Sequence, residues 1–191
     1  MTVREQIEIA ARPSPWHSRV KDFLLLAESG AFATCARAEL IDGEIWIVNA
    51  IHSRHASIQA ELQGLVWQAL RAAGSALRTY VTPSIEIADD SLPEPDLVVA
   101  DAHNDGFLPI AKVRLVIEVA DTTLATDLGR KLHLYAAAGI GEYWVADADA
   151  RTIHQLWAPD GDGYAETRRV AFGDPLIAAT VPGVTIATTS L

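Results

Sequence analysis

Two apolar segments in the middle of the chain each carry an acidic residue that a buried strand does not ordinarily tolerate. The segment 113–120 reads VRLVIEVA, with apolar residues for both faces of a sheet, which is typical of a central strand. Glu118 lies within it, and Asp96 opens a shorter apolar run, 96–100. A buried ionised carboxylate destabilises a fold unless it is paired, hydrogen-bonded or bound to a cation. These two acids therefore constrain the fold and the function together.

A helical pattern over 124–138 follows the second segment and brings in a lysine. Asp127, Lys131 and Tyr135 are spaced i, i+4 and i+8, so they share one stripe of the helix. The neighbouring stripe, expected to face the sheet, holds Leu124, Leu128 and Leu132. A lysine at the border of a buried face can reach the two acids. It could orient or help deprotonate a water, or stabilise charge that develops on a phosphate.

The two acids suggest a metal site, although simpler explanations are open. If the strand ends lie side by side, Asp96 and Glu118 meet, and their oxygens suit Mg²⁺ or Mn²⁺. Alternatively, Asp127 and Lys131 form an exposed helix pair, Asp96 caps a turn, and Glu118 pairs with Arg114 or another cation. The buried pattern around Glu118 is the hardest to explain in that way.

Two upstream residues are further candidates. Glu39 lies in the first arm of a predicted hairpin and could add a third carboxylate. His55 lies near the start of a predicted helix, where it could contact a phosphate or position water. His52 and His55 are spaced i, i+3, which suits either a pair of metal ligands or a polar helix start.

The composition limits the protein class. The 191 residues predict one domain over 14–191 with a loose arm at 1–13. No apolar run approaches the roughly 18 residues of a transmembrane helix, and the N-terminus lacks a signal core, so a cytoplasmic protein is expected. The single cysteine, Cys35, excludes an internal disulfide and a cysteine-based zinc cage. The net charge of −10 argues against bulk attraction to nucleic acid.

The remaining pattern predicts a mixed α/β (α+β) domain with helices packed on a strongly twisted sheet. The expected elements are a helix from Ser14 to about Gly30, a hairpin over 37–48 around Asp42-Gly43, a helix over 51–74, a strand over 77–88, a surface loop over 101–111, a hairpin of 142–146 with 151–157, a strand over 164–170 and a last strand in 181–191. The residues expected to point inward include Val81, Ile85, Ile87, Trp46, Trp67, Trp144 and Trp157.

An ordered set of motifs resembles the Uma-two family of restriction endonuclease-like proteins. In chain order they are ELIDGEI at 39–45, His55, PDLVV at 95–99, LVIEV at 115–119, Asp127 with Lys131 and Tyr135, AGI at 138–140 and EYWVAD at 142–147. Each motif is weak alone, but the ordered set is specific and covers most of the chain.

The resemblance implies a PD-(D/E)XK nuclease core, in which a helix precedes a twisted mixed sheet with the active site at its splayed edge. Asp96 would match the first acid of the motif and Glu118 the second. The lysine normally follows the second acid by two positions, where this chain has Ala120, so Lys131 on the next helix would take its place. Glu39 and His55 match positions that commonly complete such a site.

The expected activity is a Mg²⁺-dependent (or Mn²⁺-dependent) endonuclease that cuts nucleic acid, DNA in the first instance. Asp96, Glu118 and Glu39 would hold the metal and Lys131 would assist the attacking water. A homodimer would suit the cutting of two strands. The alternatives are a binding or scaffold protein with this fold and no turnover, which the net charge favours, and a metal hydrolase of another phosphate ester. One departure is the segment 120–123, ADTT, where the family more often has a Leu-Ser-Pro-Ser type of turn.

Overall fold

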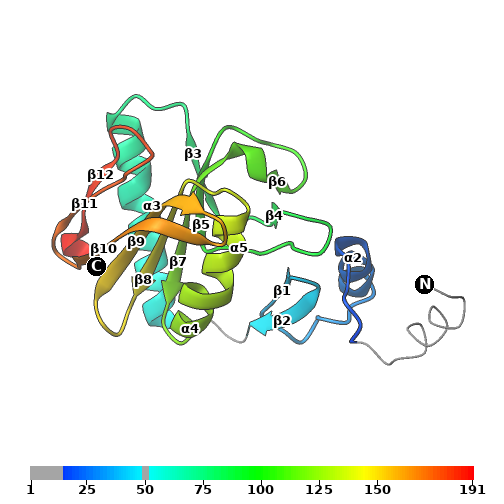
Figure 1. The fold of residues 1–191 in the computed structure, drawn as a ribbon. Coiled ribbons are helices and arrows are strands. Elements are labelled where there is room, and N and C mark those ends of the chain that lie inside the picture. The colour runs from blue at the N-terminus through cyan, green and yellow to red at the C-terminus, as the bar shows by residue number, and fades with distance from the viewer. Residues whose placement is uncertain (1–14, 49–51) are drawn as a thin grey trace, which may run out of the picture.

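A six-stranded mixed sheet forms the centre of the protein, with strand order β10-β9-β8-β7-β5-β3 (Figure 1). The computed structural model describes residues 15–48 and 52–191. Strands β7 and β8 run parallel, and all other neighbours in this sheet run antiparallel. The strands are β3 (Arg78–Val81), β5 (Leu97–Ala100), β7 (Val113–Ala120), β8 (Glu142–Asp147), β9 (Thr152–Asp160) and β10 (Gly163–Ala171).

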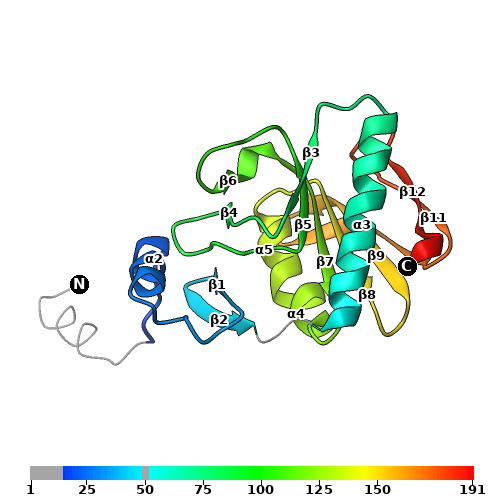
Figure 2. The ribbon, with the colours of Figure 1, turned by 180° about the vertical axis from the view of Figure 1, so that it is seen from behind.

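Helices cover both faces of the sheet. Helix α3 (Ser53–Ala72) packs on one face, and the segment made of α4 (Leu124–Thr126), η2 (Asp127–Lys131) and α5 (Leu132–Ala137) packs on the other (Figures 1 and 2). Side chains alternate along a strand, so β7 serves both layers. Leu115, Ile117 and Val119 lie in the core under α3, whereas Val116 and Ala120 lie in the core under α5. Glu118 belongs by this alternation to the α5 face.

A hairpin and a helix stand to one side of the sheet. Strands β1 (Arg37–Ile41) and β2 (Glu44–Val48) form the hairpin, and α2 (Val20–Glu28) lies outside it (Figure 1). Phe23, Leu40 and Leu92 form their shared core. The smaller elements are β4 (Ile85–Glu86) paired with β6 (Leu108–Pro109), η1 (Ile110–Lys112), β11 (Pro175–Ile177) paired with β12 (Thr185–Ala187), and η3 (Thr188–Ser190).

The mixed α+β class, the first hairpin, the long helix α3 and the central strand β7 agree with the prediction from sequence. The predicted Asp42-Gly43 turn has φ of 49° and 75°, the left-handed values that a two-residue hairpin turn requires. None of the helices within 15–48 and 52–191 is both long and apolar enough to cross a membrane. The predicted arm at 1–13 and the predicted cap Ser14 lie outside the described residues.

Several predicted elements differ from the structure at their ends. The first helix begins only at Val20, because the preceding backbone bonds elsewhere: Ser18 N–H donates to Gly43 O and Val20 N–H to Asp89 O. The strand predicted over 77–88 is broken at Thr82, whose φ is 47°, and its second part pairs with β6 in a different sheet. The loop predicted over 101–111 therefore contains a strand. The last strand predicted in 181–191 is present as β12, and it pairs with a short strand, β11, that the sequence pattern did not predict.

Two side chains predicted to point inward lie at the surface. Val81 is 52% exposed, because β3 is an edge strand of the sheet. Trp67 is 50% exposed on the outer side of α3, where the guanidinium of Arg71 lies 5.7 Å from its ring centroid. The apolar pattern of the helix alone could not show that Trp67 is exposed, because a cation–π contact can stabilise a tryptophan at the surface.

The predicted helix over 124–138 is present but is not uniform. Its middle, η2, is a single π-helical turn between two α-helical pieces. Both charged ends of this turn, Asp127 and Lys131, are buried. Short π-helical turns occur frequently at functional sites.

Candidate active site

The two acids that stood out in the sequence lie side by side. Strands β5 and β7 pair with Leu97 opposite Ile117, so Asp96, just before β5, comes next to Glu118. The Val119 N–H donates to Asp96 Oδ2 over 2.8 Å, and the Asp96 N–H lies 3.4 Å from Glu118 Oε2. Both residues are only 2% exposed.

Lys131 connects Glu118 to the hairpin. Its Nζ lies 3.0 Å from Glu118 Oε1 and 3.0 Å from Glu39 Oε2. The Tyr135 hydroxyl, one helical turn further on, donates to the same Glu118 Oε1 over 3.0 Å. The alternative of an exposed Asp127–Lys131 pair is therefore wrong, because both side chains are buried on the sheet side.

Asp127 completes a group of buried carboxyl groups. Its Oδ2 accepts a hydrogen bond from Thr123 Oγ1 over 2.5 Å, and its backbone carbonyl accepts one from the Tyr143 hydroxyl. Arg114 is not the partner of Glu118, since it binds Asp101 at the surface, and the cation that pairs with Glu118 is Lys131. Six of the seven residues predicted for the site thus lie in one region of the fold, and the seventh, His55, joins them through Asp96.

His55 and Arg37 hold Asp96 from the other side. His55 Nε2 donates to Asp96 Oδ2 over 3.0 Å, which places the predicted histidine in the site. Arg37 was not predicted; it lies 3.1 Å from Glu39 Oε1 and 3.5 Å from Asp96 Oδ1. Residues i and i+2 of a strand share a face, so the spacing of Arg37 and Glu39 was the signal that could have identified it. His52 contacts Asp121 instead of joining His55.

Burial and mutual repulsion raise the pKa of two of the carboxyl groups. Burial raises the pKa of Glu118 well above its ordinary value, and Asp96, Asp127 and Glu39 add to this against the attraction of Lys131. Burial likewise raises the pKa of Asp127 to about 6. Two acids in one site compete for the ionised state, and a nearby cation relieves that competition.

Asp96 and Lys131 are held in their charged forms. Burial opposes ionisation of Asp96, but the hydrogen bonds from His55 and the Val119 N–H, together with Arg37, lower its pKa. Burial also opposes the charge of Lys131, but Glu118, Glu39 and Asp127 outweigh it and raise the pKa of the lysine. Without a bound metal, Lys131 is therefore an ammonium at neutral pH, which suits charge stabilisation.

The donors present fit a hard divalent cation with an open coordination shell. Asp96 Oδ1 is buried and accepts no hydrogen bond from the described residues, and Glu118 Oε2 has only the long contact to the Asp96 N–H. Within 15–48 and 52–191, no three His, Cys, Asp or Glu side chains are grouped as a metal site. Mg²⁺ is commonly held by one or two carboxylates, with water and phosphate oxygens as its other ligands. Asp96 and Glu118 supply such a pair.

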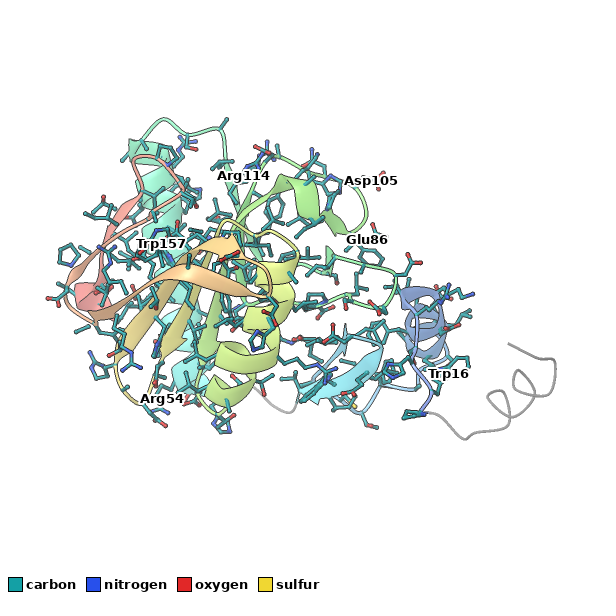
Figure 3. All side chains as sticks on the ribbon, viewed as in Figure 1. Trp16, Arg54, Glu86, Asp105, Arg114 and Trp157 are labelled. Atoms are coloured by element: carbon teal, nitrogen blue, oxygen red, sulfur yellow. The ribbon has the colours of Figure 1, made fainter. Side chains whose placement is uncertain are left out.

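A cavity of about 350 Å³ opens beside the acids. Its buried floor carries four carboxyl groups and the basic groups that contact them, namely Glu39, Asp96, Glu118 and Asp127 with Arg37, His55 and Lys131. Its side walls come from β2 and from the segment between β7 and η2, which carries threonine hydroxyls. Arg54, at the start of α3, is bound to Asp121, which lines the cavity, and to Asp149 (Figure 3 labels Arg54).

A mixed sheet with paired buried carboxylates and a lysine at one end defines the protein as a restriction-endonuclease-like α+β fold. A solved structure entitled "Crystal structure of a putative nuclease belonging to DUF820 from Anabaena variabilis ATCC 29413" has the same fold, with a TM-score of 0.64 and 19% sequence identity. The match covers 91% of this chain and 92% of the other. The chain belongs to the Uma2 family, described as "Putative restriction endonuclease", whose model matches residues 20–189. No curated protein matches the chain.

Proposed function

We propose that this protein hydrolyses phosphodiester bonds in nucleic acid, DNA in the first instance, in a reaction that depends on Mg²⁺ or Mn²⁺. The observation that carries the proposal is the buried contact of Asp96 and Glu118 with Lys131 at 3.0 Å from the glutamate. Membership of a restriction-endonuclease-like family supports the reaction class.

The proposed roles follow from charge and position. Asp96 and Glu118 hold the divalent cation, and Glu39 is the third carboxylate, bound at present by Lys131 and Arg37. When bound, such a cation activates water and offsets charge on the phosphate. Lys131, an ammonium, stabilises the negative charge that develops on the phosphate oxygens. His55 fixes the orientation of Asp96, and Tyr135 fixes that of Glu118.

Incubation of the purified protein with supercoiled plasmid tests the proposal. We expect nicked and linear product with Mg²⁺ or Mn²⁺ and none with EDTA. Glu118→Gln and Lys131→Met should each lower the rate about 100- to 1,000-fold, the loss expected when one charge-stabilising group is removed. The matched controls are Glu86→Gln and Lys112→Met, at residues outside the cavity, and they should leave the rate unchanged.

A second measurement separates metal binding from turnover. Mn²⁺ should raise the melting temperature of the wild-type protein and should not raise that of Glu118→Gln, because a cation that binds only the folded state stabilises it. Cleavage that survives Glu118→Gln would contradict the proposed site. Metal binding without cleavage of any nucleic acid would contradict the nuclease activity and favour a binding protein. A homodimer, proposed for cutting two strands, would appear in sedimentation of the wild-type protein.

A further inference from the structure

The cavity above the acids has three chemically different surfaces. Its floor carries the carboxylates, its hydroxyl wall carries Thr122, Thr123 and Thr126, and its apolar wall is formed by β2. That apolar wall consists of Trp46, Ile47 and Val48. An acidic floor that suits a cation-bound phosphate, beside an apolar wall and hydroxyl groups, is complementary to a whole nucleotide rather than to a phosphate alone.

The depth of the acids limits the size of what can reach them. Glu39, Asp96 and Glu118 are each no more than 2% exposed, so a reacting phosphate must enter the cavity. The volume of about 350 Å³ is near the lower end of the roughly 300–1,000 Å³ typical of pockets for single small molecules. The bases of a continuous duplex are stacked and paired, so a nucleotide must leave the stack before it can enter a pocket. The cavity therefore matches one unstacked nucleotide better than a continuous duplex.

Trp46 gives the apolar wall a feature suited to a base. The guanidinium of Arg130 lies 5.1 Å from its ring centroid, which fixes the ring against the helix. Trp46 lines the cavity and is only partly buried. Its indole ring therefore offers a surface on which an unstacked base can stack, a contact that any base can make.

The basic side chains in and near the cavity are paired with acidic side chains of the protein itself. Arg37 and Lys131 contact the carboxylates of the site, and Arg54 contacts Asp121 and Asp149. Non-specific duplex binding relies on a set of cations along the phosphates. The chain has a net charge of −10, with 15 basic against 25 acidic side chains.

We infer that the substrate is an unpaired nucleotide segment, that is, a single strand, a strand end or an unpaired loop, and that Trp46 is a recognition residue for its base. This inference rests on the proposed phosphodiester chemistry. DNA and RNA share the phosphate and the base, so both strand types are candidates and the experiment compares them.

Cleavage of fluorescein-labelled oligonucleotides with Mg²⁺ tests the inference. The substrates are single-stranded DNA, single-stranded RNA, the blunt DNA duplex of the same sequence, and that duplex with a central unpaired loop. We expect single-stranded or looped substrate to be cut at least tenfold faster than the blunt duplex. Trp46→Leu should lower kcat/KM on the preferred strand by about tenfold, chiefly through KM, within the range of a lost base–aromatic contact. Trp67→Leu is the matched control, since that tryptophan also lies beside an arginine but outside the cavity.

Binding measured by fluorescence anisotropy with Ca²⁺ in place of Mg²⁺ gives an independent readout of the same preference. Blunt duplex that is bound as tightly and cut as fast as single strands would overturn the inference and leave the proposed nuclease function intact. Equal effects of Trp46→Leu and Trp67→Leu would overturn the role of Trp46. Absence of cleavage of every substrate would instead contradict the proposed function, and the anisotropy preference would then decide the inference alone.

Discussion

At the scale of single residues, Asp127 links the stability of the metal-free protein to pH. Burial raises its pKa to about 6 in the folded state, above the ordinary value of 3.8. The folded state therefore holds this proton more tightly than the unfolded state does. The resulting contribution to stability is complete below about pH 4 and is lost as the pH rises through 6. Glu118, whose pKa burial also raises, acts in the same direction.

Replacement of Asp127 by Asn should remove part of this dependence. In EDTA, we expect the free energy of unfolding of the wild-type protein to fall by a few kcal/mol between about pH 4 and pH 8, and to fall less in Asp127→Asn. Urea unfolding followed by circular dichroism measures both. Asp96 does not interfere, because its lowered pKa affects stability only at more acidic pH. Parallel pH curves for the two proteins would contradict the buried titration of Asp127.

Two of the site residues predicted from sequence were found because their charge conflicts with the apolar residues around them, and the others came from helical spacing and the family resemblance. Glu118 and Asp96 interrupt apolar strands, and the structure buries them together. Arg37 gave no such conflict, since an arginine at the start of a strand is ordinarily exposed. Sequence also could not show that Lys131 contacts Glu39 across the cavity, because that contact joins two elements 92 residues apart.

At the scale of elements, Arg130 fastens the β1–β2 hairpin to the helix that carries Lys131. Its guanidinium contacts Asp42 over 3.2 Å and Glu44 over 2.5 Å, donates to the Ile41 carbonyl, and lies over the Trp46 ring. The hairpin supplies Glu39 and Arg37 to the site, so this contact sets the distance between the two halves of the cavity.

Arg130→Ala should loosen the hairpin and lower activity more than stability. We expect the plasmid-nicking rate to fall about tenfold and the melting temperature by only a few degrees, because partly exposed ion pairs contribute about 0–1 kcal/mol each. Arg130→Lys keeps the charge but loses the planar fork, so an intermediate rate is expected. Arg114→Ala is the control, since that arginine lies away from the hairpin (Figure 3). A wild-type rate in Arg130→Ala would show that the hairpin is placed without this contact.

Elements specified by short-range chemistry were predictable, and those specified by distant partners were not. The Asp42-Gly43 turn follows from the residues that tolerate a positive φ. The break of the predicted strand at Thr82 depends on the pairing of Ile85 with Leu108, which lies in another part of the chain. The π-helical turn η2 likewise had no local signal, since the spacing of its residues is also that of an α-helix.

At the scale of the whole molecule, acidity predicts how binding responds to salt. With a net charge of −10 and the cations near the cavity already paired, few phosphates can be neutralised by protein side chains. The slope of log affinity against log salt is about −0.9 per neutralised phosphate for duplex DNA and about −0.7 for single strands.

We therefore expect a shallow salt dependence and a strong dependence on the divalent cation. For single-stranded DNA with Ca²⁺, the slope between about 50 and 200 mM salt should be smaller in magnitude than about 2, which corresponds to about three phosphates or fewer. Removal of the divalent cation by EDTA should weaken binding more than this increase in salt. Anisotropy titrations measure both effects. A steep slope that does not depend on Ca²⁺ would reveal a basic binding surface and contradict the expectation.

Because η2 is a π-helical turn, the number of residues in this segment affects the positions of the site residues on either side of it. A π turn closes over five residues where an α turn closes over four, so deletion of one residue within Asp127–Lys131 would restore a continuous α-helix. Each residue of an α-helix advances the chain by about 100°. Such a deletion would change the angular phase of Thr123 and Asp127 relative to Tyr135, although every site residue would still be present. A one-residue deletion in this segment is therefore expected to disrupt the site, whereas the surface loops can change in length without this effect.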